Sequence, residues 1–230
     1  NRFISERVNE LKRRKIKFVQ ADICNLDEIK IYVKEAQVVH HLAGITDVAY
    51  VKKDANPDQD EKIKKVAIKG TENVLKSMND KATIVFPSTH VVFEGLKKPK
   101  TNLDENEDTS TFLAYSSSKV VNENQIINSG KKYAIFRLGS VYGFSTDTMR
   151  INIMPNLFSK IASQNGTIKL FGGGVQFKSL VPLIDVARCF KFVEENKKFN
   201  SGIYNLTKEN TTVKEVALIC KKINPKIKII

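Results

Sequence analysis

Tyr115 and Lys119 form the sharpest chemical signal in the sequence, as the two ends of the run YSSSK. Residues four apart on a helix share one face, so these two side chains would lie side by side. A lysine ammonium beside a phenol favours the phenolate and lowers the pKa of the phenol. Such a tyrosine can give or take a proton near neutral pH, although the spacing alone also fits two exposed side chains on an ordinary helix.

Thr89 lies upstream of this pair, at the predicted carboxyl end of a strand. Its hydroxyl could hydrogen-bond the same substrate oxygen that Tyr115 protonates or deprotonates. A hydroxyl at a strand end also serves as a local backbone cap, so the position alone leaves both roles open.

The elements that would position these residues alternate along the chain. Short β-rich runs are predicted at residues 16–19, 38–42, 83–86 and 133–138. Helical patterns are predicted at residues 2–15, 60–78 and about 113–128. Apolar strands separated by helices predict an α/β fold with a parallel sheet covered on both faces.

Small and polar residues follow the predicted strands. They are Asp22, Ala43 with Gly44, Ser88 with Thr89, and Ser140. In an open α/β sheet, ligands bind beyond the carboxyl ends of the strands. The sequence therefore predicts a ligand cleft along that edge.

The pattern changes after about residue 152, where Gly172, Gly173 and Gly174 precede a second apolar run at residues 180–184. A further strand is predicted at residues 202–206, and Thr211 and Thr212 are expected to cap a helix with Glu215 completing a capping box. We expect a sheet domain over residues 1–151 and a smaller mixed α/β substrate-binding lobe over residues 152–230, with some segments of the latter returning to the sheet.

The composition is that of an ordinary globular chain. It has 230 residues, of which 41% are hydrophobic and 27% charged. No run approaches the ~18 apolar residues of a membrane span, and no signal-peptide pattern is visible. The cysteines Cys24, Cys189 and Cys220 form no CxxC or zinc pattern, which predicts a reduced, cytoplasmic compartment without a metal site.

The formal net charge of +13 comes mostly from lysines in short clusters. A basic chain can bind nucleic acid or an anionic membrane. Because no arginine-rich tract or aromatic platform accompanies the lysines, the sequence favours a solvated lysine-rich surface over a nucleic-acid partner.

Several motifs occur in the order of a known family. They are residues 21–23 (ADI), 38–44 (VVHHLAG), 70–75 (GTENVL), 87–93 (PSTHVVF), 137–143 (RLGSVYG) and the segment 172–187. Together with YSSSK they make the chain resemble the extended short-chain dehydrogenase/reductase family, which includes the NAD-dependent epimerases and dehydratases of nucleotide sugars.

The resemblance implies a Rossmann-like doubly wound sheet and a redox cycle on a bound nicotinamide. Tyr115 would be the acid/base, Lys119 would orient the ribose and tune Tyr115, and Thr89 would bind the reacting oxygen. The cofactor, NAD with NADP not excluded, would contact Asp22, Ile23, Leu42, Ala43, Gly44, Tyr115 and Lys119. A nucleotide-diphosphate sugar would contact Thr46, Ser140 and Lys178.

The family's oligomers suggest a homodimer through the helix bearing Tyr115 and the helix of residues 60–78. The chain departs from the family in lacking the glycine-rich GxxGxxG motif, so a fragment of a longer protein is expected, and this piece by itself is expected to bind NAD weakly or not at all and to be inactive. Ala67 and Ser140 stand where the family usually has asparagines, and Lys178 where it has an arginine, so the charge stays but the bidentate fork is lost.

The residues after Thr89 separate the reactions of the family. Dehydratases carry an Asp-Glu pair there, whereas this chain has His90 and Val91. The sequence therefore favours a 4-epimerase, with a reductase, dehydrogenase or dehydratase of the same family as alternatives. A non-catalytic dinucleotide- or RNA-binding family member is the alternative from another class.

Overall fold

The computed structural model describes residues 2–46, 56–98, 100–145, 149–196 and 198–230. The helices are α1 (Arg2–Arg13), α2 (Leu26–Val33), α3 (Pro57–Ser77), α4 (Ala114–Ile127), α5 (Met154–Ser163), α6 (Leu183–Glu195) and α7 (Val213–Ile223), with short 3-10 helices η2 (His90–Phe93) and η3 (Phe171–Gly174). The strands are β1 (Val38–His40), β2 (Thr83–Thr89), β3 (Lys132–Leu138), β4 (Ser140–Tyr142), β5 (Thr167–Ile168), β6 (Phe177–Pro182), β7 (Gly202–Leu206), β8 (Glu209–Thr212) and β9 (Lys228–Ile229).

The chain folds into two compact units. The sheet unit comprises residues 21–138 and 190–206, and the second unit comprises residues 1–20, 139–189 and 207–230. The sequence pattern placed a single boundary after residue 151, and the assignment of residues 152–230 to substrate binding stays a prediction. In the described part of the chain, no helix has the length and hydropathy that a membrane span requires.

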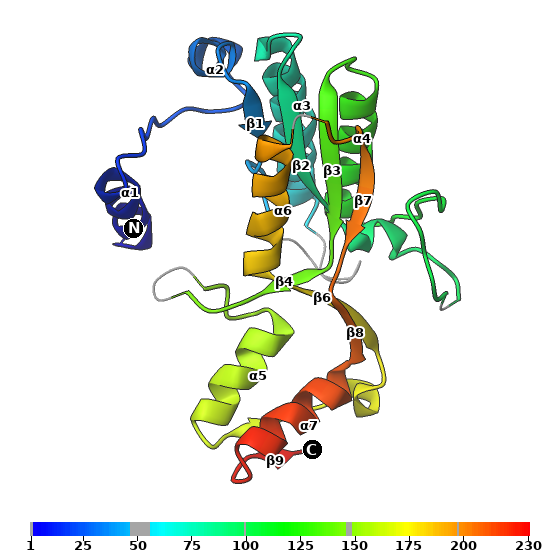
Figure 1. The fold of residues 1–230 in the computed structure, drawn as a ribbon. Helices are drawn as coiled ribbons and strands as arrows, with labels where there is room; N and C mark the ends of the chain where they lie inside the picture. Colours follow the sequence, from blue (N-terminus) through cyan, green and yellow to red (C-terminus); the bar gives the residue numbers. More distant parts are fainter. Residues whose placement is uncertain (1, 47–55, 99, 146–148, 197) are drawn as a thin grey trace. The chain divides into compact units, whose positions relative to one another are not determined.

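The sheet unit is built on four parallel strands in the order β1-β2-β3-β7 (Figure 1). Ser88 of β2 pairs with Arg137 of β3, and Arg137 pairs with Asn205 of β7. Thr89 stands one position further, opposite Leu138. This arrangement confirms the predicted α/β class with a parallel sheet.

Helices cover both faces of this sheet. Ile84 and Phe86 point to one face and pack in a buried cluster with Val74 of α3 and Ile126 of α4. On the other face, the ring of Phe136 stacks on Phe190 of α6 at 5.7 Å between centroids. The alternation along β2 and β3 therefore buries both faces, as expected of parallel sheets.

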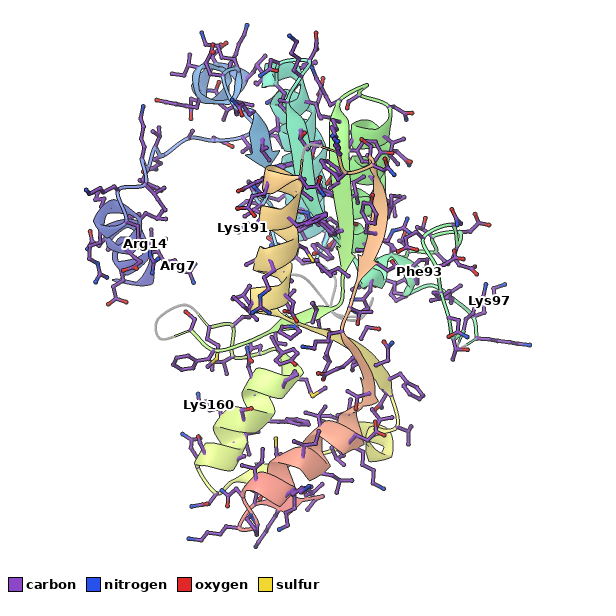
Figure 2. All side chains as sticks on the ribbon, viewed as in Figure 1. Arg7, Arg14, Phe93, Lys97, Lys160 and Lys191 are labelled. Atoms are coloured by element: carbon purple, nitrogen blue, oxygen red, sulfur yellow. The ribbon has the colours of Figure 1, made fainter. Side chains whose placement is uncertain are left out.

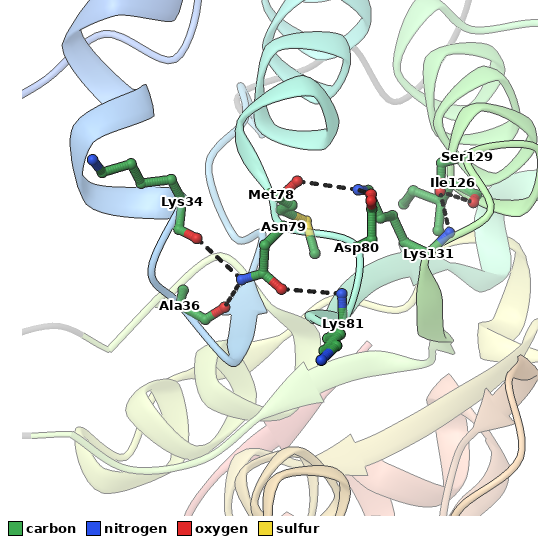
Figure 3. Close-up of polar contacts among 9 residues, drawn as sticks. All are labelled: Lys34, Ala36, Met78, Asn79, Asp80, Lys81, Ile126, Ser129 and Lys131. Atoms are coloured by element: carbon green, nitrogen blue, oxygen red, sulfur yellow. Dashed lines mark hydrogen bonds and ion pairs between the residues drawn. The ribbon is translucent and has the colours of Figure 1, made fainter.

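Side-chain hydrogen bonds connect the loops at the amino end of the sheet (Figure 3). Asn79, in the turn between α3 and β2, donates its Nδ2 to the carbonyls of Lys34 and Ala36, each at 3.0 Å. Lys131 donates its Nζ to the Met78 carbonyl at 3.1 Å and to the Asp80 carboxylate at 2.6 Å. The loops at this end are thus fixed to each other, on the edge opposite the predicted cleft.

The second unit has a small mixed sheet in the order β4-β6-β8 and a two-stranded pair of β5 and β9. Phe158 of α5 and Ala217 of α7 belong to its buried cluster. The capping box predicted at Thr212 and Glu215 is present at the start of α7.

One local prediction was wrong. Residues 16–19 form no strand, because a strand needs a hydrogen-bonded neighbour and no described strand pairs with them. The apolar run at residues 180–184 is divided, with β6 ending at Pro182 and α6 starting at Leu183. A short apolar run cannot by itself distinguish a buried strand from the first turn of a helix.

Candidate active site

Thr89 is the last residue of β2 and the cap of η2. Its side-chain Oγ1 accepts a hydrogen bond from the backbone N–H of Val91 at 3.2 Å, and the residue is buried. The hydroxyl therefore sits at the predicted carboxyl edge of the sheet and keeps its own proton available for a second partner.

Helix α4 starts on an anchor that comes from the segment following Thr89. Leu113, the residue before the helix, makes no side-chain cap. The carboxylate of Glu94 instead accepts the backbone N–H groups of Phe112 at 3.2 Å and Leu113 at 2.9 Å, and the hydroxyl of Ser116. A carboxylate suits the positive end of a helix, so Glu94 fixes the start of α4 relative to η2.

Lys119 ties α4 to β2 one turn after Tyr115. Its Nζ donates to the carbonyl oxygen of Pro87 at 2.7 Å and lies 4.3 Å from the centroid of the Phe86 ring. The same Nζ lies 5.8 Å from the centroid of the Tyr115 ring. The structure therefore brings Tyr115 and Lys119 together on one helix face that packs against the strand ending in Thr89.

Burial controls the charge of two groups at this site. Desolvation lowers the pKa of Lys119 to about 8, and the nearby carboxylate of Glu123 opposes that shift. Desolvation, reinforced by the charge of Lys119, lowers the pKa of His41 to about 4. At pH 7 Lys119 is therefore mostly protonated and His41 is neutral.

The predicted dinucleotide contacts at residues 42–44 follow β1 at the carboxyl edge of the sheet unit, whereas Asp22 follows no described strand, because residues 16–19 form none. Leu42, two residues after β1, is 60% exposed, and no atom of the described residues lies within 4 Å of where a Cβ of Gly44 would be. The Asp22 carboxylate accepts the backbone N–H of Cys24 at 2.9 Å and is exposed.

Three residues of α3 hold these segments in place. A Cβ on Gly70 would lie 2.3 Å from the Cδ1 of Ile23, so only glycine leaves room for that side chain. Asn73 donates its Nδ2 to the Ile23 carbonyl at 2.9 Å, and Thr71 shares a 2.9 Å hydrogen bond with the buried ring of His41. The residue types alone indicate no site role for these positions; the run GTENVL was the available signal.

The predicted substrate contacts are divided between the two units. Thr46 is exposed on the sheet unit. Ser140 is half-buried at the start of β4 and Lys178 is exposed on β6, both in the second unit. Their roles stay predictions.

His40 and His90 make local contacts, and the glycine run forms a turn. His90 bonds through Nδ1 to the Leu138 carbonyl at 2.8 Å, and His40 pairs with Glu194 while stacking on Phe190. Gly172 has a φ of 57°, in the left-handed region that suits a tight turn. Among the described residues, no group of three or more potential ligands could hold a metal ion.

Lysines are spread over several elements rather than collected at the site. Lys97, Lys160 and Lys191 are exposed and their side chains extend away from the ribbon (Figure 2). Lys191 also pairs with Glu195 of its own helix at 3.3 Å. This distribution agrees with a solvated lysine-rich surface.

Comparisons with known proteins identify the family of the chain. A model of the family described as "NAD dependent epimerase/dehydratase family" matches residues 3–207. A Methanocaldococcus jannaschii protein assigned as a UDP-glucose 4-epimerase is 32% identical over 182 residues, which are 76% of this chain. The chain spans 58% of the length of that relative.

Two solved structures share the fold. The UDP-glucose 4-epimerase of Thermus thermophilus, in complex with NAD, has a TM-score of 0.75 at 20% identity, over 94% of this chain and 72% of the other. A dTDP-4-dehydrorhamnose reductase of Clostridium acetobutylicum has a TM-score of 0.72 at 20% identity, over 100% of this chain and 78% of the other. The motifs, the sheet and the family match agree, and the chain belongs to the NAD-dependent epimerase/dehydratase family.

Proposed function

We propose that this chain carries the catalytic residues of a nucleotide-sugar 4-epimerase that works by transient hydride transfer. The observation that supports it most directly is that Tyr115 and Lys119 lie one turn apart on the same face of α4. Lys119 hydrogen-bonds to the Pro87 carbonyl and so ties this face to β2, the strand that ends in Thr89. A phenol, an ammonium and a hydroxyl at one edge are the groups that carbonyl–alcohol chemistry needs.

Each residue has a separate task in the proposed reaction. Tyr115 takes the proton from the C4 hydroxyl of the sugar and returns it when the carbonyl is reduced again. Thr89 donates or accepts a hydrogen bond at that same oxygen and holds it next to the phenol. The ammonium of Lys119 stabilises the phenolate form of Tyr115 through its positive charge.

The cofactor of this proposal is NAD, with NADP as the alternative. A bound nicotinamide would accept the hydride from C4 and give it back to the other face of the sugar. Residues 42–44, with Leu42 exposed and no atom of the described residues within 4 Å of a Gly44 Cβ, fit a dinucleotide lying along the edge. Asp22 and Ile23 would hold its adenosine end, with the Ile23 backbone already fixed by Asn73.

The residues after Thr89 separate an epimerase from a dehydratase. Elimination of water requires an additional acid and base, and the two positions after Thr89 hold His90 and Val91. The His90 ring is turned to the Leu138 carbonyl and caps the end of β3. The relative from Methanocaldococcus jannaschii, assigned as a UDP-glucose 4-epimerase, further supports epimerisation.

The test is interconversion of UDP-glucose and UDP-galactose by the purified full-length protein with added NAD, followed by chromatography of the nucleotide sugars. We expect interconversion without net release of reduced cofactor. The Tyr115→Phe variant should lose about 10²–10⁴-fold in rate, the usual contribution of a positioned acid/base.

Tyr32→Phe, on the exposed side of α2, is the matched control and should keep the rate. Stoichiometric accumulation of reduced cofactor would show a dehydrogenase instead of an epimerase. Interconversion that survives Tyr115→Phe unchanged would contradict the proposed role of Tyr115.

A further inference from the structure

A row of polar residues crosses the sheet at the level of β2 that lies between Pro87 and Thr89. Ser88, Arg137 and Asn205 are paired neighbours on β2, β3 and β7. The preceding position on β2 is Pro87, which accepts Lys119, and the following one is Thr89. Anything that holds this row therefore fixes the strand positions on both sides of it.

Glu123 of α4 joins this row to the helix that carries Tyr115. Its two oxygens accept from the Arg137 guanidinium, at 3.2 Å from Nε and 2.8 Å from Nη2, and Oε1 also accepts the hydroxyl of Ser88. The ion pair is buried, with side chains only 4% and 3% exposed. Two fixed bonds from a planar guanidinium give the pair a defined orientation.

From this geometry we propose that Glu123 is a positioning residue of the active site, which aligns Tyr115 and Lys119 with Thr89 through its bonds to Arg137 and Ser88. The inference rests on the proposed function and deepens it. Glu123 lies one helical turn beyond Lys119, as Lys119 lies one turn beyond Tyr115, so one face of α4 carries all three. Glu123 contacts β2 and β3 rather than substrate, and is thus no catalytic residue itself.

The other side of Arg137 is also occupied. Its Nη1 donates to the Glu105 carbonyl at 3.2 Å, and its guanidinium lies 5.4 Å from the ring centroid of Phe93, a residue labelled in Figure 2. The Glu105 carboxylate accepts the backbone N–H of Asn205 at 2.6 Å. The loop that leads to α4 is therefore hydrogen-bonded to Arg137 and Asn205 of the same row. A shift of Arg137 would move this loop as well.

The charge of Glu123 also reaches Lys119. The groups around Lys119 are Tyr115 and Glu123 on its own helix, His41 after β1, and the Pro87 carbonyl on β2. Of these, Glu123 is the carboxylate that raises the pKa of Lys119 against desolvation. Loss of its charge should therefore make Lys119 deprotonate at lower pH.

The experiment compares the full chain with Glu123→Gln, Glu123→Asp and the double variant Glu123→Gln/Arg137→Met. The first readout is the pH dependence of acetylation of Lys119 by acetic anhydride, followed by peptide mass spectrometry. Because only the neutral amine reacts, the midpoint reports the pKa of Lys119 without any turnover. The second readout is kcat and KM for sugar interconversion.

We expect Glu123→Gln to shift the midpoint of Lys119 acetylation about one pH unit lower and to lower kcat about tenfold or more, with KM within about twofold. Glu123→Asp keeps the negative charge, so its pH midpoint for Lys119 acetylation should lie close to that of the parent chain. Glu72→Gln is the matched control, because Glu72 pairs with Lys69 and Lys76 on the exposed side of α3. It should leave both readouts as in the parent chain.

The double variant answers the case in which Glu123→Gln alone does not fold, since it leaves no unpaired buried arginine. It should keep cooperative thermal unfolding and still show the lowered midpoint. A midpoint and kcat equal to those of the parent in a folded Glu123 variant would overturn the proposal. A shifted midpoint in a chain without sugar interconversion would support the positioning of Lys119 and contradict the proposed function.

Discussion

The Nζ of Lys119 donates a 2.7 Å hydrogen bond to the carbonyl oxygen of Pro87, two residues before Thr89. This bond joins the helix that carries Tyr115 to the strand that carries Thr89. Glu94, in the segment after β2, also holds the start of α4, and Glu123, one turn after Lys119, accepts a hydrogen bond from Ser88 of β2. The helix is therefore attached to β2 and the segment that follows it at three points. The phenol and the hydroxyl thus belong to one rigid arrangement.

Replacing Lys119 by methionine should abolish most of the activity while keeping the fold. The variant removes the charge beside Tyr115 and the bond to Pro87, so we expect kcat to fall about 10²–10⁴-fold. Thermal unfolding should change little, because a desolvated ammonium is replaced by an apolar chain of similar length. Lys62→Met on α3 is the control, and equal kcat in both variants would contradict a special role for Lys119.

Thr89→Val should distinguish the effect of the Thr89 hydroxyl on the reaction from the effect of the side chain's size. Valine keeps the shape of the strand end but cannot bond the reacting oxygen or the Val91 N–H. We expect kcat to fall about 10–100-fold, corresponding to about 1.4–2.8 kcal/mol, while Thr89→Ser retains most of the rate. Steady-state kinetics check this, and a valine variant as fast as the serine variant would exclude the hydroxyl from the reaction.

The burial of His41 makes stability depend on pH. Its pKa is about 4 in the folded chain, because burial and then Lys119 disfavour the charged ring, against about 6.5 in the unfolded chain. The unfolded state therefore binds the proton first as pH falls. The contribution of neutral His41 to the free energy of unfolding is fully present above about pH 6.5. About 3 kcal/mol of it is lost as pH falls toward 4.

Urea unfolding at pH 7 and at pH 4.5 measures this loss. His41→Gln, which can still bond Thr71 but does not titrate, should show a smaller loss between the two values. His90→Gln is the control for removing a histidine from the same unit. A parent chain and a His41→Gln variant with identical pH dependence would refute the contribution of His41.

Gly70→Ala should destabilise the sheet unit. The added methyl would lie 2.3 Å from the Cδ1 of Ile23, closer than any real contact, so Ile23 or α3 must move. We expect a loss of about 1–3 kcal/mol, the usual cost of overpacking. Gly44→Ala, whose Cβ meets no atom of the described residues within 4 Å, is the matched control, and denaturant midpoints that agree for the two variants would contradict the close packing.

The sequence by itself determined the strands of the main sheet, the helix that carries Tyr115, and the position of Ser88 and Thr89 at the end of a strand of that sheet. These follow from apolar periodicity and from the chain order of parallel strands, which are local properties. The spacing of Tyr115 and Lys119 likewise placed both on one helix face before any tertiary contact was known. The capping box at Thr212 was readable for the same reason.

Only the tertiary structure decided how these pieces are held. No sequence motif considered above includes Glu94 or Glu123 as a site residue, and their partners come from segments that only folding brings near. Arg137 meets Ser88 because β2 and β3 pair in one particular register, which no local pattern encodes. The run at residues 16–19 has strand propensity without a described strand beside it, and propensity alone does not make a strand.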